Sequence, residues 1–204
     1  MSAHMTGAAE RSAIAEEDLL RARLYRLLAR FLARPPSREE LALAAAMSGD
    51  HSELGKAVQA FSEVAARQGE DGVAQEFHDL FIGLGRGELL PYESYYLTGF
   101  LHEKPLAQLR RDMEALGIAG DESSPETEDH IAALMDMMAG LIEGSFGAPA
   151  DIATQKKFFD HHVGSWAKHF FRELEGAKSS VLYATLGQVG RVFMDIEEVA
   201  FSMD

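Results

Sequence analysis

The spacing of apolar residues constrains the fold of this chain more than any other feature, because they recur at three- and four-residue intervals along most of its length. In the first such segment, Leu20, Leu24, Leu27, Leu28 and Phe31 fall on one face of a helix. Sustained alternation of apolar and polar residues, which is typical of strands, is absent from the sequence, and so are internal repeats. We therefore predict an all-α fold with one helical-bundle domain at residues 15–204, preceded by a flexible segment at 1–14.

Prolines, glycines and capping residues predict where the helices of the first half begin and end. Pro35 and Pro36 end the first helix, and Ser37 with Glu40 forms a capping box for a short second one. The apolar pattern predicts a third helix at about 54–65 and a fourth at about 73–81, separated by a glycine-containing turn. Short connections of this kind favour antiparallel packing.

A glycine-rich loop interrupts the helical pattern at Gly83-Leu84-Gly85-Arg86-Gly87, because alternating glycines make a continuous helix costly. Pro91 extends the break, and an aromatic cluster of Tyr92, Tyr95 and Tyr96 follows it. A further helix is expected at about 105–116. The polar segment 117–124 then resembles a hinge loop between an N-terminal and a C-terminal group of helices.

The second half of the chain carries equally clear helix signals. Ser124 at the cap and Pro125 in the first turn predict a helix start, with three acids near its positive end. Asp151 is expected to cap one helix that contains both Phe158 and Phe170, and a last helix covers about 181–196.

Composition excludes several classes of protein. The chain contains no cysteine, which rules out disulfides, thiolate metal sites and a cysteine nucleophile. Its formal net charge of −14 opposes binding to nucleic acid or to anionic membranes and favours a basic partner. No apolar run of signal-peptide or membrane-span length is visible, so we expect a cytoplasmic protein without stable membrane insertion.

Two features of the sequence resemble parts of enzymes, and each also has an ordinary structural interpretation. The glycine loop follows a helix and lacks the spacing and lysine of a phosphate-binding loop, so a structural loop is favoured. No histidine has a glutamate three residues upstream, the pairing that a di-iron bundle needs. Glu126, His130 and His162 still offer an alternative, a metal- or nucleotide-binding helical protein. By physics alone, Asp129 is expected to be a surface acid that complements a helix dipole.

Three motifs in order resemble the TorD/DmsD/NarJ family of molybdoenzyme-specific chaperones. The first joins Glu76-Phe77-His78-Asp79-Leu80-Phe81, the glycine loop and Leu90-Pro91-Tyr92-Glu93-Ser94-Tyr95-Tyr96-Leu97. The others are Glu126-Thr127-Glu128-Asp129-His130-Ile131 and Phe158-Phe159-Asp160-His161-His162-Val163-Gly164-Ser165-Trp166. Thr127 and Ser165 stand where the family pattern has proline. The stretch 83–101 looks most like the branch associated with formate dehydrogenase.

This resemblance implies an all-helical chaperone that has no catalytic residues and needs no cofactor or metal of its own. Its partner would be an immature molybdoenzyme catalytic subunit, here formate dehydrogenase, bound through its twin-arginine signal peptide, its mature region or both. The implied client-binding residues are Phe77, Phe81, Pro91, Tyr92, Tyr95, Tyr96, Glu126, Glu128, Asp129 and His130. We expect the tyrosines to line one groove with Asp129 and His130 at its rim, and Glu126 and Glu128 to meet the client's arginines. A generic adaptor, and a monomer or a homodimer, remain compatible with the sequence.

Overall fold

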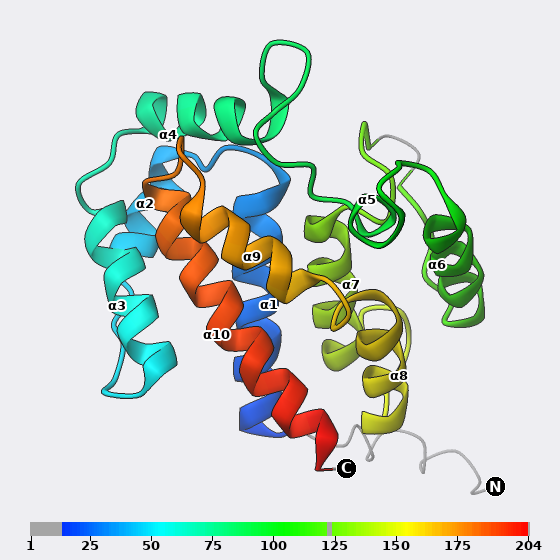
Figure 1. Cartoon of the computed structure of the whole chain (residues 1–204). Coiled ribbons are helices and arrows are strands. Elements are labelled where there is room, and N and C mark those ends of the chain that lie inside the picture. Colours follow the sequence, from blue (N-terminus) through cyan, green and yellow to red (C-terminus); the bar gives the residue numbers. More distant parts are fainter. Residues whose placement is uncertain (1–13, 122–123, 204) are drawn as a thin grey trace, which may run out of the picture.

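Residues 14–121 and 124–203 are described by a computed structural model, and within them the chain forms helices and no β-strand (Figure 1), which confirms the predicted all-α class. The elements are α1 (Glu16–Ala33), α2 (Arg38–Ala45), α3 (Glu53–Ala65), α4 (Glu70–Phe77), the π-helical turn η1 (His78–Ile82), α5 (Glu93–Thr98), α6 (Lys104–Ala115), α7 (Ile131–Glu143), α8 (Ile152–His162), α9 (Ala167–Gly176) and α10 (Leu182–Ser202). No helix in this part of the chain is both long enough and apolar enough to cross a membrane. Residues 1–13 of the predicted N-terminal segment lie outside the described residues.

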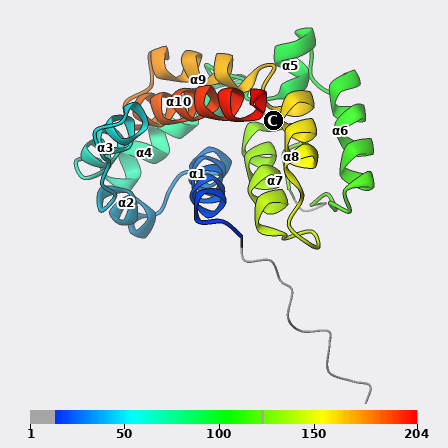
Figure 2. The same cartoon turned by 90° about the horizontal axis from the view of Figure 1, so that it is seen from below.

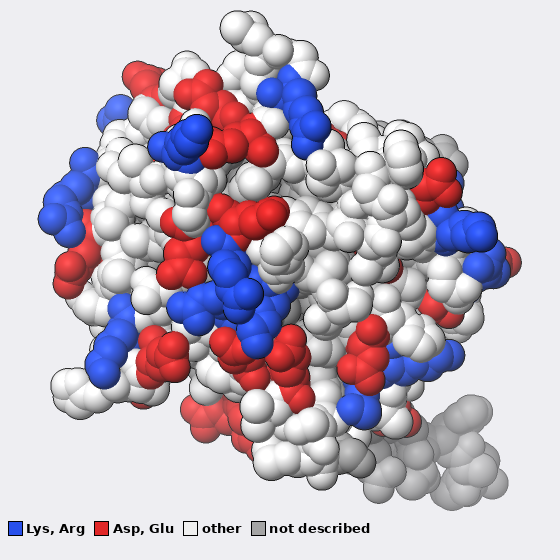
Figure 3. Space-filling view, viewed as in Figure 1, with Lys and Arg blue, Asp and Glu red and all other residues white. Residues whose placement is uncertain are grey.

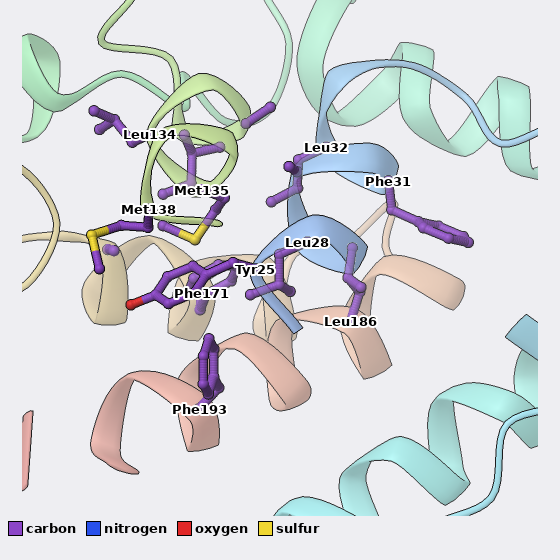
Figure 4. Close-up of a cluster of buried hydrophobic side chains, with 14 of the residues drawn as sticks. Tyr25, Leu28, Phe31, Leu32, Leu134, Met135, Met138, Phe171, Leu186 and Phe193 are labelled. Atoms are coloured by element: carbon purple, nitrogen blue, oxygen red, sulfur yellow. The ribbon is translucent and has the colours of Figure 1, made fainter. Parts of the chain in front are cut away.

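The first helix occupies the middle of the molecule. α1 packs along α7 and also touches α10, while α10 packs against α9 and α3 (Figures 1 and 2). Figure 4 shows the core at this crossing, formed by Tyr25, Leu28 and Leu32 of α1, Leu134, Met135 and Met138 of α7, and Phe171, Leu186 and Phe193 of α9 and α10. Burial of each such side chain contributes roughly 1.5–3 kcal/mol. Because α1 and α7 lie on opposite sides of the 117–124 segment in sequence, this core joins the two groups of helices that the hinge was expected to separate.

An ion pair between a partly exposed arginine and a buried glutamate links α1 to α10 beside this core. Glu197 of α10 is completely buried and accepts hydrogen bonds from Arg21 Nε at 2.7 Å, Arg21 Nη2 at 2.8 Å and Tyr25 Oη at 2.8 Å. Burial, together with the charge of Glu197, raises the pKa of Tyr25 well above its usual value. The carboxylate thus has three charge-assisted or hydroxyl donors, which offset the loss of its hydration.

The helix caps predicted by the sequence are largely present. Ser37 and Glu40 form the expected capping box at the start of α2, with Ser37 N donating to Glu40 Oε2 at 2.7 Å. Asp151 caps α8 by accepting from Thr154 N at 2.8 Å. The helix that follows Asp151, however, does not continue through Phe170. It ends at His162, and α9 begins at Ala167.

The break between α8 and α9 has a local cause that the prediction of one helix missed. Gly164 N donates to Phe159 O at 2.7 Å, and a Cβ at Gly164 would lie only 2.8 Å from the ring of Phe159. The indole Nε1 of Trp166 then donates to His162 O at 2.8 Å and closes the turn. A glycine that packs under an aromatic ring therefore redirects the chain here.

The helix start predicted at Ser124 is wrong by several residues, because α7 begins at Ile131 with His130 as its cap. The acids of the intervening segment were expected in the first helical turn, yet they lie in turns that precede it. The competing interaction is between backbones. Tyr92 and His130 form an isolated antiparallel bridge, and Ile131 N donates to Pro91 O at 2.8 Å. An extended residue at His130 cannot also be helical.

Candidate functional site

Two sequence motifs meet at the backbone bridge between Tyr92 and His130. On one side of it, Glu93 N donates to Asp129 O at 3.0 Å, where α5 begins. On the other side, α7 begins directly after His130. The short helix α5 was not predicted from the sequence, because six residues show too little periodicity. The bridge therefore fixes the starts of α5 and α7 beside each other.

Asp129 serves this junction from inside the protein. Its side chain has no exposed surface, so the prediction of a surface acid is wrong. Oδ2 accepts from Ser94 N at 3.1 Å, and Oδ1 accepts from Thr127 Oγ1 at 2.6 Å. The carboxylate thereby satisfies a backbone donor in the first turn of α5, which is the function of a helix cap.

His130 plays the matching role for α7. Its Nδ1 accepts from Ala132 N at 3.1 Å, so the ring proton lies on Nε2 in the neutral form. Burial lowers the pKa of His130 to about 4, although the charges of Glu126 and Asp129 act in the opposite direction. The imidazole is therefore neutral at pH 7, and it offers one N–H donor.

The polar groups at the edge of the junction already have partners. Tyr92 Oη donates to a carboxylate oxygen of Glu126, and its ring meets the ring of His130 edge-on at 5.1 Å. Glu128 accepts from Arg110 Nη2 at 2.8 Å, and this contact contributes most to lowering the pKa of Glu128. Glu126 and Glu128 were expected to bind the arginines of a client. Both are near the surface, but an incoming guanidinium must share or replace these contacts.

A hollow of about 670 Å³, here called the α1–α7 hollow, lies against this junction. Its floor is apolar and includes Met113, Ile118, Met137 and Phe146, whereas acids and two arginines of α1 stand around it. The lining residues of the described chain are Arg26, Ala29, Arg30, Ala33, Met113, Ile118, Ala119, Gly120, Asp121, Ser124, Pro125, Glu126, Thr127, Glu128, His130, Ala132, Ala133, Asp136, Met137 and Phe146.

A second hollow of about 690 Å³, here called the tyrosine hollow, lies between the glycine loop, α5 and α9. Arg86 of the loop donates to Tyr95 Oη at 2.9 Å and also lies over the ring of Tyr95. Tyr96 packs on Trp166 and donates through Oη to Glu173. The lining is completed by Glu88, Leu89, Leu90, Gly99, His169, Gly176 and Ala177.

The predicted client-binding residues therefore do not share one groove. Tyr95 and Tyr96 line the tyrosine hollow, whereas Glu126, Glu128 and His130 line the α1–α7 hollow. Asp129 and Pro91 are buried at the junction. Phe77 and Phe81 contact each other and Tyr183 of α10 in the core, with Phe77 buried and Phe81 partly exposed. The single-groove geometry is wrong, while the role of each residue in client binding stays a prediction.

The glycine loop projects from the bundle above the tyrosine hollow (Figure 1). Gly83 has a φ of 61°, and a Cβ there would lie 2.1 Å from Arg86 O, so this turn requires glycine. Large apolar side chains are exposed on the loop and beyond α5, among them Leu84 and Phe100. In Figure 3 the tip of the loop carries no charged side chain, and an uncharged area lies to the right of the centre of this face, with charged side chains around its outer edge. Exposed apolar groups of this kind are typical of a contact surface.

Sequence reasoning missed three glutamates that hold the elements around the hollows, two of them buried (Glu76 and Glu93) and one exposed (Glu88). Glu76 of α4 accepts from Val181 N at 2.7 Å, Leu182 N at 3.2 Å and Tyr183 N at 2.8 Å, and so caps α10. Glu88 accepts from Lys178 N at 2.7 Å and ties the glycine loop to the connection before α10. The signal for Glu76 was present, because it lies on the apolar face of its own helix, three residues after Val73.

A third glutamate is paired with a histidine. Glu93 of α5 is buried, and its Oε1 lies 3.2 Å from His162 Nδ1, while Asp112 Oδ2 of α6 lies 2.9 Å from His162 Nε2. Burial raises the pKa of Glu93 despite the hydrogen bond from His162. Among the described residues, the donors of Asp112, His161 and His162 are the one group close enough to hold a metal ion. The alternative set of Glu126, His130 and His162 is not brought together.

The same helical fold occurs in a solved structure. The structure of this chain is similar to that of a putative redox enzyme maturation protein from Archaeoglobus fulgidus, with a TM-score of 0.57 over 92% of this chain and 99% of the other, at 16% sequence identity. At this identity the likeness shows a shared fold.

The chain belongs to the nitrate reductase delta subunit family, whose sequence model matches residues 48–172, more than half of the chain. Curated relatives are called chaperone protein TorD. The protein from Vibrio cholerae serotype O1 is 29% identical over 145 residues, which span 67% of this chain and 66% of the relative. The one from Aliivibrio fischeri is 31% identical over 133 residues, which span 58% of this chain and 61% of the relative. The resemblance to the TorD/NarJ family is thus confirmed.

Proposed function

We propose that this protein is a cytoplasmic chaperone that binds an immature molybdoenzyme subunit and assists its maturation without catalysing a reaction. Membership of the nitrate reductase delta subunit family and the name of the TorD relatives support this proposal. The structural observation that carries it is the α1–α7 hollow, which combines an apolar floor with an acidic surround. Such a site suits a peptide that carries basic residues next to apolar ones.

A twin-arginine signal peptide has this chemistry, and we propose it as the segment bound in the α1–α7 hollow. The lining contains four acids, Asp121, Glu126, Glu128 and Asp136, against two arginines. Guanidinium groups bind carboxylates through paired, charge-assisted hydrogen bonds. Glu126 is exposed and is engaged by the neutral hydroxyl of Tyr92, so it can accept a guanidinium while it keeps that bond. The formal charge of −14 adds long-range attraction for a basic segment.

Formate dehydrogenase is the client that we propose, because residues 83–101 resemble the branch of the family associated with that enzyme. This stretch forms the projecting loop and α5, which lie beside the tyrosine hollow. Affinity capture of the tagged protein from its own host, followed by mass spectrometry, tests the assignment. A co-purifying formate dehydrogenase catalytic subunit is the expected result. Capture of a different molybdoenzyme would refute this client, and capture of no molybdoenzyme while these enzymes are expressed would refute the chaperone.

The peptide site is tested separately with a fluorescent signal peptide that contains two arginines. Fluorescence anisotropy should give a saturable titration, and replacing both arginines by glutamine should weaken binding. Glu126→Gln with Glu128→Gln should also weaken it, by about tenfold for each carboxylate if each contact contributes about 1.4 kcal/mol. Glu17→Gln with Glu39→Gln is the matched control, because both glutamates are exposed and neither lines the α1–α7 hollow.

The affinities of these variants show which of the two hollows binds the peptide. If the acidic pair matters and the control pair does not, the α1–α7 hollow holds the peptide. If neither glutamine pair changes the affinity while Tyr95→Ala in the tyrosine hollow abolishes it, the client binds between the glycine loop and α9, and the assignment to the α1–α7 hollow is wrong. Circular dichroism of each variant guards against loss of the fold, since Arg110 loses its partner in Glu128→Gln.

A further inference from the structure

Two helices, α6 and α8, place a set of metal-ligand atoms close together. Asp112 lies near the end of α6, and His161 and His162 are the last two residues of α8. His162 Nε2 is 2.9 Å from Asp112 Oδ2, and His161 Nδ1 is 3.7 Å from the same oxygen. The donor atoms of all three lie within 4.8 Å of one another. We call these three residues the α6–α8 cluster.

The donor set and its spacing suit a tetrahedral zinc ion. Two imidazoles and one carboxylate are common zinc ligands, with metal–ligand distances of about 2.0–2.2 Å. Such bonds place neighbouring donors about 3.3 Å apart, given tetrahedral geometry. The separations in the cluster begin at 2.9 Å and reach no further than 4.8 Å. The longer of the two contacts to the carboxylate, 3.7 Å from His161 Nδ1, is close to the spacing that a tetrahedral ion needs, and the His161 side chain is half exposed.

Neighbouring residues fix the orientation of the buried ligand His162, as a metal site requires. Glu93 Oε1 accepts from His162 Nδ1 at 3.2 Å, which leaves Nε2 directed at Asp112. A carboxylate on the far nitrogen of a ligating histidine is a recurrent feature of zinc sites, where it fixes the ring and strengthens the ligand. His162 O accepts from Trp166 Nε1 at 2.8 Å, and Gln108 Nε2 donates to Asp112 Oδ2 at 3.1 Å. These contacts fix the backbone of one ligand and the carboxylate of another.

The charges around the cluster also favour a bound cation. Two carboxylates, Glu93 and Asp112, face a single buried imidazole, and the second oxygen of Glu93 is buried without a hydrogen-bond partner. A divalent ion between His162 Nε2 and Asp112 offsets part of this negative charge. Without a metal, a proton on His162 Nε2 bridges to Asp112. A divalent ion replaces that proton and adds His161 as a ligand.

A hollow reaches the cluster and leaves room for a water molecule as the fourth ligand. This hollow has a volume of about 130 Å³ and is lined by Asp112, His161, Leu116, Phe158 and Lys157, among others. Several water molecules fit in this volume, since each occupies about 30 Å³. Lys157 is exposed, so its amine can stay in solvent away from the ion. The route gives a metal ion access to the cluster from outside.

We propose that Asp112, His161 and His162 bind one divalent transition-metal ion, with zinc the best match, and that a water molecule completes its coordination. The ion joins the end of α6 to the end of α8 and, through Glu93, holds α5. This inference does not rest on the proposed function, because none of the three ligands lines the α1–α7 hollow or the tyrosine hollow.

The test uses the full chain carrying a tag without histidine, freed of metal by a chelator. Isothermal titration with Zn²⁺ should show one site per chain, and Mg²⁺ should show none because it prefers oxygen ligands. Co²⁺ in place of Zn²⁺ should give the intense visible absorption of a tetrahedral site. Zn²⁺ should also raise the unfolding temperature, since binding to the folded state alone stabilises it.

The variants separate this cluster from other histidines. His161→Gln removes a half-exposed ligand without disturbing the core, and it should weaken Zn²⁺ binding by more than the 10–100-fold that loss of an outer partner produces. Asp112→Asn should act in the same direction. His51→Gln is the matched control, because His51 is exposed and lies outside the cluster. Absence of a saturable one-to-one site, or equal affinities in the His161 and His51 variants, would overturn the proposal.

Discussion

The cap formed by His130 makes the stability of the protein depend on pH in a way that a single substitution can remove. The neutral ring accepts from Ala132 N at 3.1 Å through Nδ1, and it is almost fully buried. A protonated ring has no acceptor atom, so protonation removes the cap and leaves a charge inside the protein. His130→Asn is the sharpest perturbation, because asparagine is a favoured cap residue that does not titrate.

The size of the effect follows from the pKa of His130. Burial lowers it to about 4, whereas the unfolded chain has the usual value of 6.5. At pH 5 the unfolded state is therefore protonated at this residue and the folded state is not. The folded pKa is depressed, so the stabilisation is present above pH 6.5 and is lost as the pH falls toward 4. Between pH 7.5 and pH 5 the loss amounts to about 2 kcal/mol.

Urea unfolding of both proteins at pH 7.5 and pH 5 measures this quantity. The wild-type protein should lose about 2 kcal/mol more than His130→Asn over this interval, because the other titrating groups contribute equally to both. For a chain of this size the difference corresponds to about 4–8 °C in unfolding temperature. Equal losses in the two proteins would refute the argument, as would an NMR titration of the His130 ring in the folded protein with a midpoint near 6.5.

Three further predictions concern the buried contacts and the glycine loop. Glu76→Ala should lower the free energy of unfolding by about 3 kcal/mol or more, because three backbone donors at the start of α10 lose their acceptor. Glu76→Gln should lose less because it keeps one acceptor oxygen; chemical unfolding measures both, and equal losses in the two variants would contradict this reasoning. Glu197→Ala should lower the free energy of unfolding by about 3–5 kcal/mol, because Tyr25 and Arg21 lose their buried acceptor while Arg21 keeps only its contacts with Asp18 and Gln155. A thermal scan in which Glu197→Ala behaves like the exposed control Glu17→Ala would contradict this. Gly83→Ala should destabilise the protein by about 1–3 kcal/mol, because residue 83 has a φ of 61° and a Cβ there would lie 2.1 Å from Arg86 O. Gly85→Ala should destabilise it less, because no atom lies within 4 Å of a Cβ at that position. The reverse order of unfolding temperatures in differential scanning fluorimetry would refute the steric argument.

The sequence predicted the fold class well because the information for it is local. Apolar spacing identifies the faces of α1, α7 and α10, and a serine or aspartate followed by a suitable residue identifies the caps at Ser37 and Asp151. These signals depend only on neighbours within one or two helical turns. The errors occurred where a distant segment competes with them, as at Ser124, where pairing with Pro91 displaces the helix start to Ile131.

The candidate site was predictable in its residues and unpredictable in its layout. Motif resemblance selected Tyr92, Asp129 and His130, and the structure does bring these three together at the bridge. The motif resemblance does not determine which of these side chains face solvent. A buried acid such as Asp129 is indistinguishable in sequence from a surface acid, because its partner, Ser94 N, is a backbone group 35 residues away. Division of the residues between two hollows likewise depends on tertiary packing that no local pattern contains.

The ion pair between Arg21 and Glu197 can form only late in the synthesis of this protein. The two residues are separated by 176 positions, so α1 leaves the ribosome long before its partner in α10 exists. At about 5–20 residues per second, the delay is about 10–35 s. During that interval the apolar face that carries Leu28 and Leu32 lacks α10, and until residue 143 has been made it also lacks α7. A protein proposed to shelter unfinished enzymes is thus itself exposed to aggregation until its final helix has been translated.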